Sequence, residues 1–560
     1  MTRRVRVAAT AIGILAVGGV LAAGLIGLGV VRFGPAASAL GPPRFVEETA
    51  AAGIDQVYEG GEDYQVGGGV AVFDCDADGR PDLYLAGNLH PAVVLRNVGS
   101  VGGPLRFERQ PSPSTDIAGV NGAYPLDVDG DGNVDLAVLR TTDATLLRGL
   151  GGCRFEQADA RWGFRHEGYA TAFSASWETA AARLPTVAIG DYLGLDTDRR
   201  PTLECDPANE LYRPAAAGDR YAPPVALAPG YCALSMLFSD WDRSGRRDLR
   251  VSNDRHYYDF DRGEEQLWRV APGEAPRLYG PGDGWVQVQI EGMGIASYDL
   301  TDDGYPDVYL TSQGSNRLQA LASGPARPVY QDIGLKRNVN LVRPFTGPDT
   351  SLPSTAWHPE FEDVNNDGLV DLFVSKGNVG EQPDYARQDP SNLLLGQPDG
   401  TFVEVADRAG VLSMDRGRGA ALADLNLDGL LDLIEVNLGS PVRIWRNLGA
   451  AAANDGPAAP MGHWLAVTVR QPGPNRDAIG GWLEFKVGDT VTRRELTVGG
   501  GHVSGQLGPI HVGLGSATAA SVRVTWPDGV VGPWQTAAAD TFAIVDRATG
   551  TLQPWTPPAS

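Results

Sequence analysis

Several residue types and motifs that enzymes commonly use are scarce or missing in this chain of 560 residues. It has three lysines, seven histidines, four cysteines and five methionines, so few side chains can serve as general bases or nucleophiles. The motifs H-E-x-x-H, G-x-S-x-G and G-x-G-x-x-G are absent, and no Gly-Lys pair exists for a phosphate-binding loop. Zincin, α/β-hydrolase, dinucleotide-binding and P-loop chemistry are therefore not expected.

Positive charge is also in short supply. Lysine and arginine together number 46 against 69 acidic residues, which gives a formal net charge of −23. Nucleic acid and anionic lipid surfaces are therefore not expected partners. By contrast, 72 glycines, 40 prolines and 42% hydrophobic residues suit an all-β chain with many turns and a sizeable core.

The four cysteines are too few for a disulfide scaffold, and none lies in a C-x-x-C pair. Neither a zinc site nor a redox motif is therefore predicted. Cys205 and Cys232 flank a proline-rich insertion, and we expect these two to form a disulfide. Such a bond would need an oxidising compartment. Pairing of the other two, Cys75 and Cys153, is left open.

The N-terminus predicts export. Three arginines in the first six residues precede an uncharged run over residues 7–31, which is closed by Arg32. A helix of that length is about 37 Å long, enough to cross a bilayer with some tilt. The arginines favour a cytoplasmic N-terminus. Residues 1–33 are expected to be either a membrane anchor that leaves the rest outside (N-in, C-out) or a long signal cleaved after Ala39, which ends an A-x-A site.

An acidic pattern of nine residues, D-x-D/N-x-D-G-x-x-D, recurs through the middle of the chain. Its copies start about every sixty residues, apart from one double gap between 127 and 240 that a degenerate copy at Glu178 fills. This makes seven units, each with strand signals on both sides of the loop. Four-stranded propeller blades have this size, whereas β-solenoid repeats are far shorter. The recognisable copies begin at Asp74, Asp127, Asp240, Asp299, Asp363 and Asp424.

The predicted fold is all-β: a seven-bladed β-propeller followed by a small C-terminal β domain, with one N-terminal hydrophobic helix. The sequence segment that begins at Phe45 resembles the one that begins at Phe402, and it precedes the first acidic loop. An N-terminal strand is therefore expected to complete the last blade and close the ring. The predicted boundaries are an anchor or signal at 1–33, a linker at 34–44, the propeller at 45–449, a linker at 450–460, the C-terminal domain at 461–550 and a tail at 551–560.

The acidic loops predict bound calcium. Carboxylates crowded into nine residues repel one another, and a bound divalent cation reverses the sign of that term. Calcium takes six to eight oxygen ligands and tolerates Asp, Asn, Thr and backbone carbonyls together, whereas zinc prefers His and Cys and magnesium fewer protein ligands. An EF-hand would need a glutamate at position 12 and flanking helices. About five structural Ca²⁺ sites are therefore expected, with side-chain ligands from positions 1, 3, 5 and 9.

The predicted ligands lie in five near-complete copies. They are Asp74, Asp76, Asp78, Asp82, Asp127, Asp129, Asp131, Asp135, Asp299, Thr301, Asp303, Asp307, Asp363, Asn365, Asp367, Asp371, Asp424, Asn426, Asp428 and Asp432. The sixth copy has a serine at position 5 and three nearby arginines, so metal binding there is left open. Its ligands would be Asp240, Asp242, Ser244 and Asp248. The copy at Glu178 is expected to have lost the metal. Ordinary Asp-Gly hairpin turns are the competing interpretation.

The acidic loops resemble the FG-GAP/VCBS repeats of integrin α-type propellers, and so do the Arg-Asn turns at Asn97 and Asn447. The predicted C-terminal domain resembles the ASPIC/UnbV domain in four sequence segments, 475–481, 499–506, 511–515 and 524–529. Together these features are similar to the cartilage acidic protein family over roughly residues 45–545. The resemblance implies a seven-bladed, calcium-binding propeller placed outside the cell, without a settled activity. The metal-less third repeat and the insertion around the expected disulfide depart from the pattern.

Three functions fit these observations. We prefer a cell-surface binding or adhesion module with a protein or glycan ligand, because binding residues concentrate on loops held by a rigid scaffold. A scaffold of an envelope complex is the second. The third is a calcium-stabilised propeller enzyme linked to natural-product biosynthesis, with its site on the loops of blades 3 and 4, where the repeat breaks its own rule. Its candidate catalytic residues are His166, Glu167, Tyr169, Glu178, Asp254, His256, Tyr257, Tyr258 and Asp259. Packing and loop roles are the competing interpretation for these, as for His502 and His511.

Overall fold

The structure is a computed structural model that describes residues 39–60, 65–255, 262–322, 324–340, 354–379, 389–451 and 458–558. The chain separates into two units, Met1–Ser38 and Ala39–Ser560, and all described residues belong to the second. The predicted N-terminal helix therefore lies outside the described residues. Among those described, no helix is long and apolar enough to cross a bilayer.

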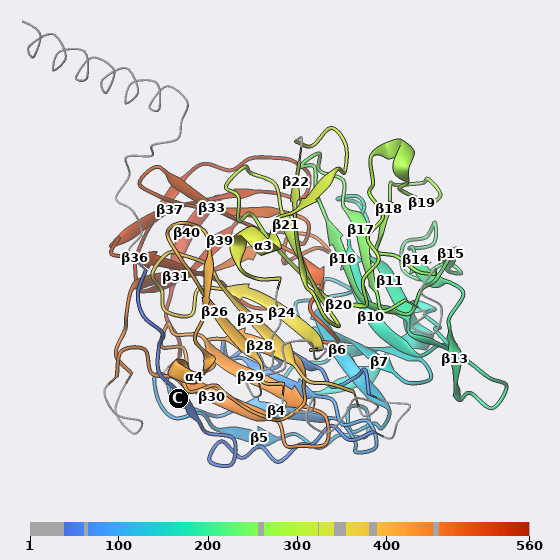
Figure 1. Cartoon of the computed structure of the whole chain (residues 1–560), viewed down its shortest axis with the longest axis horizontal. Helices are drawn as coiled ribbons and strands as arrows, with labels where there is room; N and C mark the ends of the chain where they lie inside the picture. Colours follow the sequence, from blue (N-terminus) through green and yellow to red (C-terminus); the bar gives the residue numbers. More distant parts are fainter. Residues whose placement is uncertain are drawn as a thin grey trace, which may run out of the picture. The chain divides into compact units, whose positions relative to one another are not determined.

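Seven antiparallel sheets of four strands, traced over the described residues, build most of the second unit (Figure 1). The first strands of successive sheets contact one another, and the last of them also contacts the first, so the seven surround a common axis. This arrangement confirms the prediction of an all-β propeller. The first strands are β2 (Val70–Phe73), β6 (Val120–Leu126), β10 (Ala170–Ser176), β16 (Ala233–Ser239), β20 (Gly292–Tyr298), β24 (Ala356–Glu362) and β28 (Gly417–Ala423).

The remaining strands of each sheet follow outward from the axis in chain order. The second strands are β3 (Asp82–Leu85), β7 (Asp135–Arg140), β11 (Thr186–Asp191), β17 (Asp248–Asn253), β21 (Asp307–Ser312), β25 (Asp371–Lys376) and β29 (Asp432–Asn437). The third are β4 (Val93–Asn97), β8 (Ala144–Gly149), β14 (Asn209–Tyr212), β18 (Gln266–Arg269), β22 (Arg317–Leu321), β26 (Asn392–Gly396) and β30 (Arg443–Asn447). The fourth are β5 (Phe107–Arg109), β9 (Phe155–Gln157), β15 (Val225–Leu227), β19 (Arg277–Leu278), β23 (Tyr330–Asp332), β27 (Phe402–Glu404) and β1 (Phe45–Glu47).

The N-terminal strand closes the ring. β1 pairs antiparallel with β30, with Phe45 opposite Asn447, so the last sheet takes its outermost strand from the start of the chain. In Figure 1 the orange last sheet accordingly lies beside the blue first one. The pairing predicted from the repeated phrase is confirmed, and it covers a sheet edge that would otherwise expose unpaired backbone groups.

Short helical turns and one hairpin interrupt the strand pattern. The four-residue helices each follow a fourth strand, and the hairpin is inserted between the second and third strands of the third sheet. These elements are α2 (Asp159–Trp162), α3 (Gly334–Arg337), α4 (Ala406–Ala409), the 3₁₀ turn η2 (Pro281–Asp283), and the hairpin β12 (Leu193–Leu195) and β13 (Pro201–Cys205).

Two disulfides cross-link the propeller. Cys205 pairs with Cys232, as predicted, and ties the end of the inserted hairpin to the first strand of the fourth sheet. Cys75 pairs with Cys153 and joins the first acidic loop to the second sheet. The sequence alone left this second pair open, because the two residues are 78 positions apart with no local signal.

The C-terminal domain consists of two four-stranded sheets and a segment that enters the propeller. The sheets are ordered β36-β31-β39-β40 and β33-β32-β37-β38. Residues 551–560, predicted as a tail, are corrected in part, because residues 551–555 form the strand that pairs with β39. The strands are β31 (His463–Arg470), β32 (Trp482–Val487), β33 (Thr490–Glu495), β34 (Val498–Gly499), β35 (Gly505–Gln506), β36 (Ile510–Gly515), β37 (Ala519–Thr525), β38 (Gln535–Ala538), β39 (Thr541–Asp546) and β40 (Thr551–Trp555).

Residues 498–507, here called the axial insert, contact the first strands of all seven sheets. β34 pairs with β10 and β16, and β35 pairs in parallel with β2. Isolated bridges reach β6 and β20, and the N–H of His502 donates to Nδ1 of His358 on β24 at 3.0 Å. A Cβ added at Gly419 on β28 would lie 2.3 Å from Oγ of Ser504. The C-terminal domain and the propeller therefore share one core along the axis.

Candidate metal-binding loops

Each acidic loop is closed by its first aspartate. In the first loop, Oδ2 of Asp74 accepts a hydrogen bond from the N–H of Gly79 at 2.8 Å. The equivalent bond, from the glycine at position 6 to the aspartate at position 1, recurs in the other five at 2.8–3.1 Å. We number the loops by sheet as loop 1 (74–82), loop 2 (127–135), loop 4 (240–248), loop 5 (299–307), loop 6 (363–371) and loop 7 (424–432).

The aspartate at position 9 fastens three strands together. Asp82 begins β3, and its two carboxylate oxygens accept hydrogen bonds from the N–H groups of Cys75 and Asn97, both at 2.7 Å. Asp432 is held in the same way by Leu425 at 3.0 Å and Asn447 at 2.8 Å. The Arg-Asn turns noted in the sequence are therefore the partners of this aspartate, and position 9 has a structural role beside any role as a metal ligand.

Several oxygens at predicted ligand positions have no donor. Oδ1 of Asp129, Asp299 and Asn426 is buried and accepts no hydrogen bond from any described residue. Carboxylate oxygens in loop 1 (positions 1, 3 and 5) lie within 4.8 Å of one another, as do those in loop 2 (positions 1, 3 and 9). Buried acceptors without donors, in an all-oxygen set, fit a hard divalent cation such as Ca²⁺.

Burial raises the pKa of these carboxyl groups. The pKa of Asp82 rises to about 8, and those of Asp127 and Asp307 to about 7; like charges in the same loop add to the effect. The pKa values of Asp363 and Asp424 are raised well above the usual range, again by burial first and then by a neighbouring carboxylate. A cation bound among these groups would favour their ionised forms.

Arginines on the third strands partly neutralise loops 1 and 2. Nε of Arg96 pairs with Asp76, and Nε of Arg148 pairs with Asp129 at 2.8 Å. Arg148 also pairs with Asp131. The side chains of Arg96 and Arg148 are 40% and 19% exposed, and neither pairs with the first aspartate of its loop.

Arginines occupy loops 4 and 5 more directly. In loop 4, Arg246 pairs with Asp248 at 2.9 Å and with Asp242 at 3.4 Å, so its guanidinium lies among the side chains that would bind a metal. In loop 5, Arg493 of the C-terminal domain pairs with Asp299 at 3.1 Å. Loop 4 therefore already holds a cation of its own, and loop 5 meets one supplied by the other domain.

No described arginine, lysine or histidine forms an ion pair with loops 6 and 7. Asp363 and Asp371 in loop 6, and Asp424 and Asp432 in loop 7, are buried. The carboxylate of Asp367 instead accepts a hydrogen bond from the N–H of Leu40 in the N-terminal linker at 2.8 Å. These two loops carry the most uncompensated negative charge of the set.

The degenerate third loop has no acidic cluster. Glu178 accepts hydrogen bonds from Oγ1 of Thr186 at 2.7 Å and from Nε of Arg213 at 2.6 Å. Its single carboxylate is thus already paired with an arginine.

The C-terminal domain covers the acidic-loop end of the propeller. In loop 1, a Cβ added at the position-6 glycine, Gly79, would lie 2.3 Å from Trp555 of the C-terminal domain. In loop 7, a Cβ added at the equivalent Gly429 would lie 1.9 Å from Trp464 of that domain. The N–H of Gly515 donates to the carbonyl of Asn366 in loop 6 at 3.0 Å, and Glu495 accepts from the N–H at the start of loop 4 at 2.7 Å. The loops therefore form the surface on which the domain docks.

The candidate catalytic residues do not meet at one open site among the described residues. His166 is buried and lies between Asp191 at 3.0 Å and Glu210 at 2.8 Å. Burial opposes its protonation, but the two carboxylates outweigh burial and raise the pKa of His166 to about 10. Glu167 is exposed and pairs with Arg165. The arrangement is a buried ion-pair cluster.

The other candidates are also dispersed. Tyr169 is buried and contacts the ring of Tyr192 edge-on, and the hydroxyl of Tyr192 donates to Asp254 at 2.8 Å. Burial raises the pKa of Asp254 to about 7. His256, Tyr257, Tyr258 and Asp259 lie outside the described residues.

The two C-terminal histidines lie inside the molecule. His502 is fully buried, and its ring packs on Trp357. His511 approaches Oδ1 of Asn366 in loop 6 at 2.7 Å. Burial lowers the pKa of both histidines to about 3, so both rings are neutral.

Sequence reasoning missed the arginines and the axial insert. Arg96 directly precedes Asn97 in the Arg-Asn turn, so the turn itself carried the signal for the arginine that reaches loop 1. The insert gave only a glycine-rich phrase at 499–506, with no sign of the strands it would meet.

Comparison with known proteins supports this architecture. The model of the FG-GAP-like repeat matches residues 74–138 and 363–435, and that of ASPIC and UnbV matches residues 471–551. Cartilage acidic protein 1 of Mus musculus is 22% identical over 497 residues, covering 83% of this chain and 71% of the relative. That of Xenopus tropicalis is 22% identical over 513 residues, covering 86% and 74%.

Among solved structures, the Dos1 propeller has a TM-score of 0.34 at 11% identity, covering 76% of this chain and 98% of that one. A hypothetical selenium-binding protein from Sulfolobus tokodaii has a TM-score of 0.39 at 11% identity, covering 71% and 86%. The chain therefore carries FG-GAP-like repeats and an ASPIC/UnbV domain, and it is a homologue of cartilage acidic protein 1 over most of both chains.

Proposed function

We propose that the protein is an exported binding or scaffold module, in which calcium at the acidic loops secures the C-terminal domain against the propeller. The contact of that domain with the acidic-loop face carries the proposal, because a cation bound there would stabilise the loops on which the domain docks. Calcium would then act as a structural element and not at a reaction centre.

Export is supported by the two disulfides, which include all four cysteines. Disulfides persist in oxidising compartments and are rare in the cytosol. We propose that residues 1–33 either anchor the protein at the outer face of the membrane or act as a signal cleaved after Ala39. Relatedness to cartilage acidic protein 1 agrees with placement outside the cell.

The free end of the propeller is the proposed binding face. In an antiparallel sheet the connections between strands 1 and 2 and between strands 2 and 3 lie at opposite ends. The acidic loops are the first kind of connection, and the inserted hairpin β12–β13 is the second kind, so the hairpin lies at the end away from the docked domain. Loops held by a rigid scaffold commonly carry binding residues, and a protein or glycan is the proposed partner.

Calcium titration of chelator-treated protein tests the structural part. Extracellular calcium modules bind with Kd of about 10⁻⁴–10⁻³ M, so millimolar calcium should raise the thermal midpoint. The variant Asp363→Asn/Asp424→Asn removes one charge from each of loops 6 and 7 and keeps one of the two accepting oxygens at each residue. It should lose a large part of the rise. Asp399→Asn, in the ordinary Asp-Gly turn between β26 and β27, is the matched control and should retain the full rise. An equal rise in all three proteins would contradict calcium binding at these loops.

A further inference from the structure

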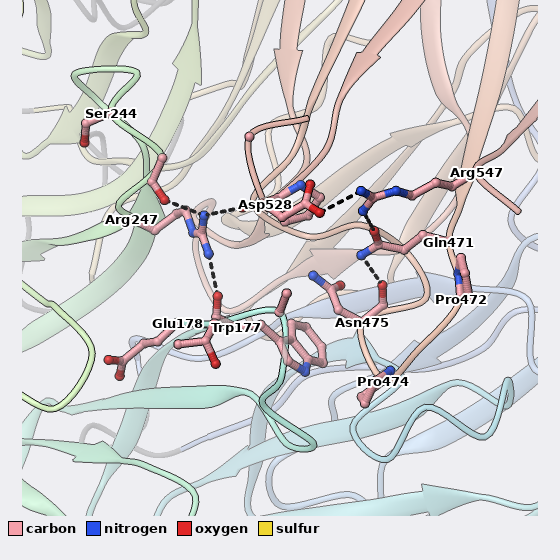
Figure 2. A pocket seen from close by; sticks show the side chains of 15 residues that line it. Trp177, Glu178, Ser244, Arg247, Gln471, Pro472, Pro474, Asn475, Asp528 and Arg547 are labelled. Carbon is pink, nitrogen blue, oxygen red and sulfur yellow. Dashed lines mark hydrogen bonds and ion pairs between the residues drawn. The ribbon is translucent and has the colours of Figure 1, made fainter. Parts of the chain in front are cut away.

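A cavity of about 360 Å³ lies where the docked domain fails to close on the propeller (Figure 2). One wall comes from the degenerate third loop around Trp177 and Glu178, and from loop 4 at Ser244 and Arg247. The opposite wall belongs to the C-terminal domain. The cavity is thus bounded on the propeller side by the degenerate third loop, which has lost its acidic pattern, and by loop 4, in which Arg246 already pairs with two aspartates. Its volume falls within the range of small-molecule sites.

The two carboxylates that line the cavity are already paired with arginines. Figure 2 shows Asp528 facing Arg547, and the two pair at 2.6 Å. Glu178 pairs with Arg213 behind the wall, also at 2.6 Å. The buried guanidinium of Arg247 donates to the carbonyls of Gly245, Trp177 and Pro527. Arg247 forms no ion pair among the described residues, although the carboxylates of Glu495, Asp240 and Glu178 favour its charged form. A cationic ligand would therefore find no unpaired carboxylate in the lining, and an anionic ligand would find a guanidinium whose N–H groups already donate to carbonyls. Either ligand would lose its hydration on entry.

The polar groups are held in place before any ligand arrives. Arg547 donates to Oε1 of Gln471 at 3.0 Å, and Nε2 of Gln471 donates to the carbonyl of Asn475 at 2.7 Å. Figure 2 shows this chain of bonds along one side of the cavity, beside Pro472 and Pro474. Fixed polar groups need little ordering on binding, which favours affinity.

We propose that this cavity binds a neutral pyranose sugar residue. Sugar hydroxyls can donate to carboxylate oxygens of Asp528 and accept from carboxamide and guanidinium groups, while the C–H face of the ring packs against the prolines. A ligand with many hydroxyls and no charge matches a lining that offers both donors and acceptors and whose carboxylates are already paired. The inference rests on the proposed binding function, because it gives that function a glycan ligand and a second site.

Saccharide binding to the full protein tests the proposal. Glucose, galactose, mannose and N-acetylglucosamine are titrated by saturation-transfer NMR and calorimetry, alongside glucuronate and the peptide Gly-Pro-Gly. At least one neutral sugar should bind. Ala180→Trp, which fills the cavity from the exposed third loop, should weaken that binding at least tenfold. Ala181→Trp, the exposed neighbour outside the lining, is the matched control and should leave binding unchanged.

The proposal is overturned if none of the neutral sugars binds, if Ala180→Trp leaves their binding unchanged, or if glucuronate or the peptide binds better. The calcium-dependent rise in thermal midpoint is recorded for every variant. It should be the same in both tryptophan variants as in the wild type, so failure of the sugar site is distinguished from failure of the calcium-secured module.

Discussion

Gly122 on β6 tests whether the axial insert is seated as described. A Cβ added at this residue would lie 1.9 Å from the carbonyl oxygen of Val503 in the insert, and one added at Gly69, directly before β2, would lie 1.8 Å from the same atom. Real side chains do not approach backbone so closely, so Gly122→Ala must push either the strand or the insert aside. Overpacking of a buried site costs about 1–3 kcal/mol.

We expect the upper part of that range, about 2–3 kcal/mol, because the obstacle is backbone and cannot rotate away. The reduced entropy of the unfolded chain offsets only about 0.4–1 kcal/mol of it. Urea unfolding followed by tryptophan fluorescence measures the difference. Gly282→Ala is the matched control, because a Cβ there meets nothing within 4 Å and the residue lies in the turn η2. It should be neutral or slightly stabilising. If Gly122→Ala proved as stable as Gly282→Ala, the insert would not occupy the axis.

Three further outcomes follow from the described contacts. His166→Asn should destabilise by about 3–5 kcal/mol, because it leaves two carboxylates without their buried cation. The folded pKa of this histidine, about 10, lies above its unfolded value of about 6.5, so its stabilisation is complete below pH 6.5 and should fade as pH rises through 10 in unfolding measurements. A difference from the variant that grows with pH would contradict this. The two disulfides close loops of 78 and 27 residues. Loop-closure entropy therefore predicts that the free energy of unfolding falls by about 4.5 kcal/mol in Cys75→Ser and by about 3.5 kcal/mol in Cys205→Ser, again measured by urea unfolding. Equal stability with the wild type would show that neither cross-link restrains the unfolded chain. Arg493→Ala should strengthen calcium binding at loop 5 in calorimetry, because it frees Asp299, and an unchanged titration would count against metal binding there.

The propeller could be predicted from the sequence because its information is local and repeated. Each acidic loop marks one turn between two strands, and the phrase shared by Phe45 and Phe402 showed where the ring closes. Contacts between segments far apart in the sequence have no comparable local signal. The insert pairs Val498 with Ala175, more than three hundred positions earlier, and its glycine-rich phrase is typical of any surface loop.

The sequence predicted which residue types stand at the candidate ligand positions, but it did not show which of these carboxylates are neutralised by an arginine. Nothing in the spacing of loops 5 and 6 distinguishes them, yet an arginine of the C-terminal domain reaches Asp299 in one, while the N–H of Leu40 reaches Asp367 in the other. The charge environment of the catalytic candidate His166 was hidden from the sequence for the same reason. His166 lies among acidic partners that the fold brings from β11 and β14, and those partners hold it as a buried cation.

The axial insert has a consequence for biosynthesis. It leaves the ribosome after every strand of the propeller and, if the chain is exported with its N-terminus leading, it also crosses the membrane after them. All seven sheets are complete in sequence by residue 447, whereas the insert begins at residue 498. A nascent propeller therefore keeps an unfilled axis and glycine-lined inner strands until residues 498–507 arrive, and a product terminated before residue 498 keeps that opening exposed to quality-control proteases.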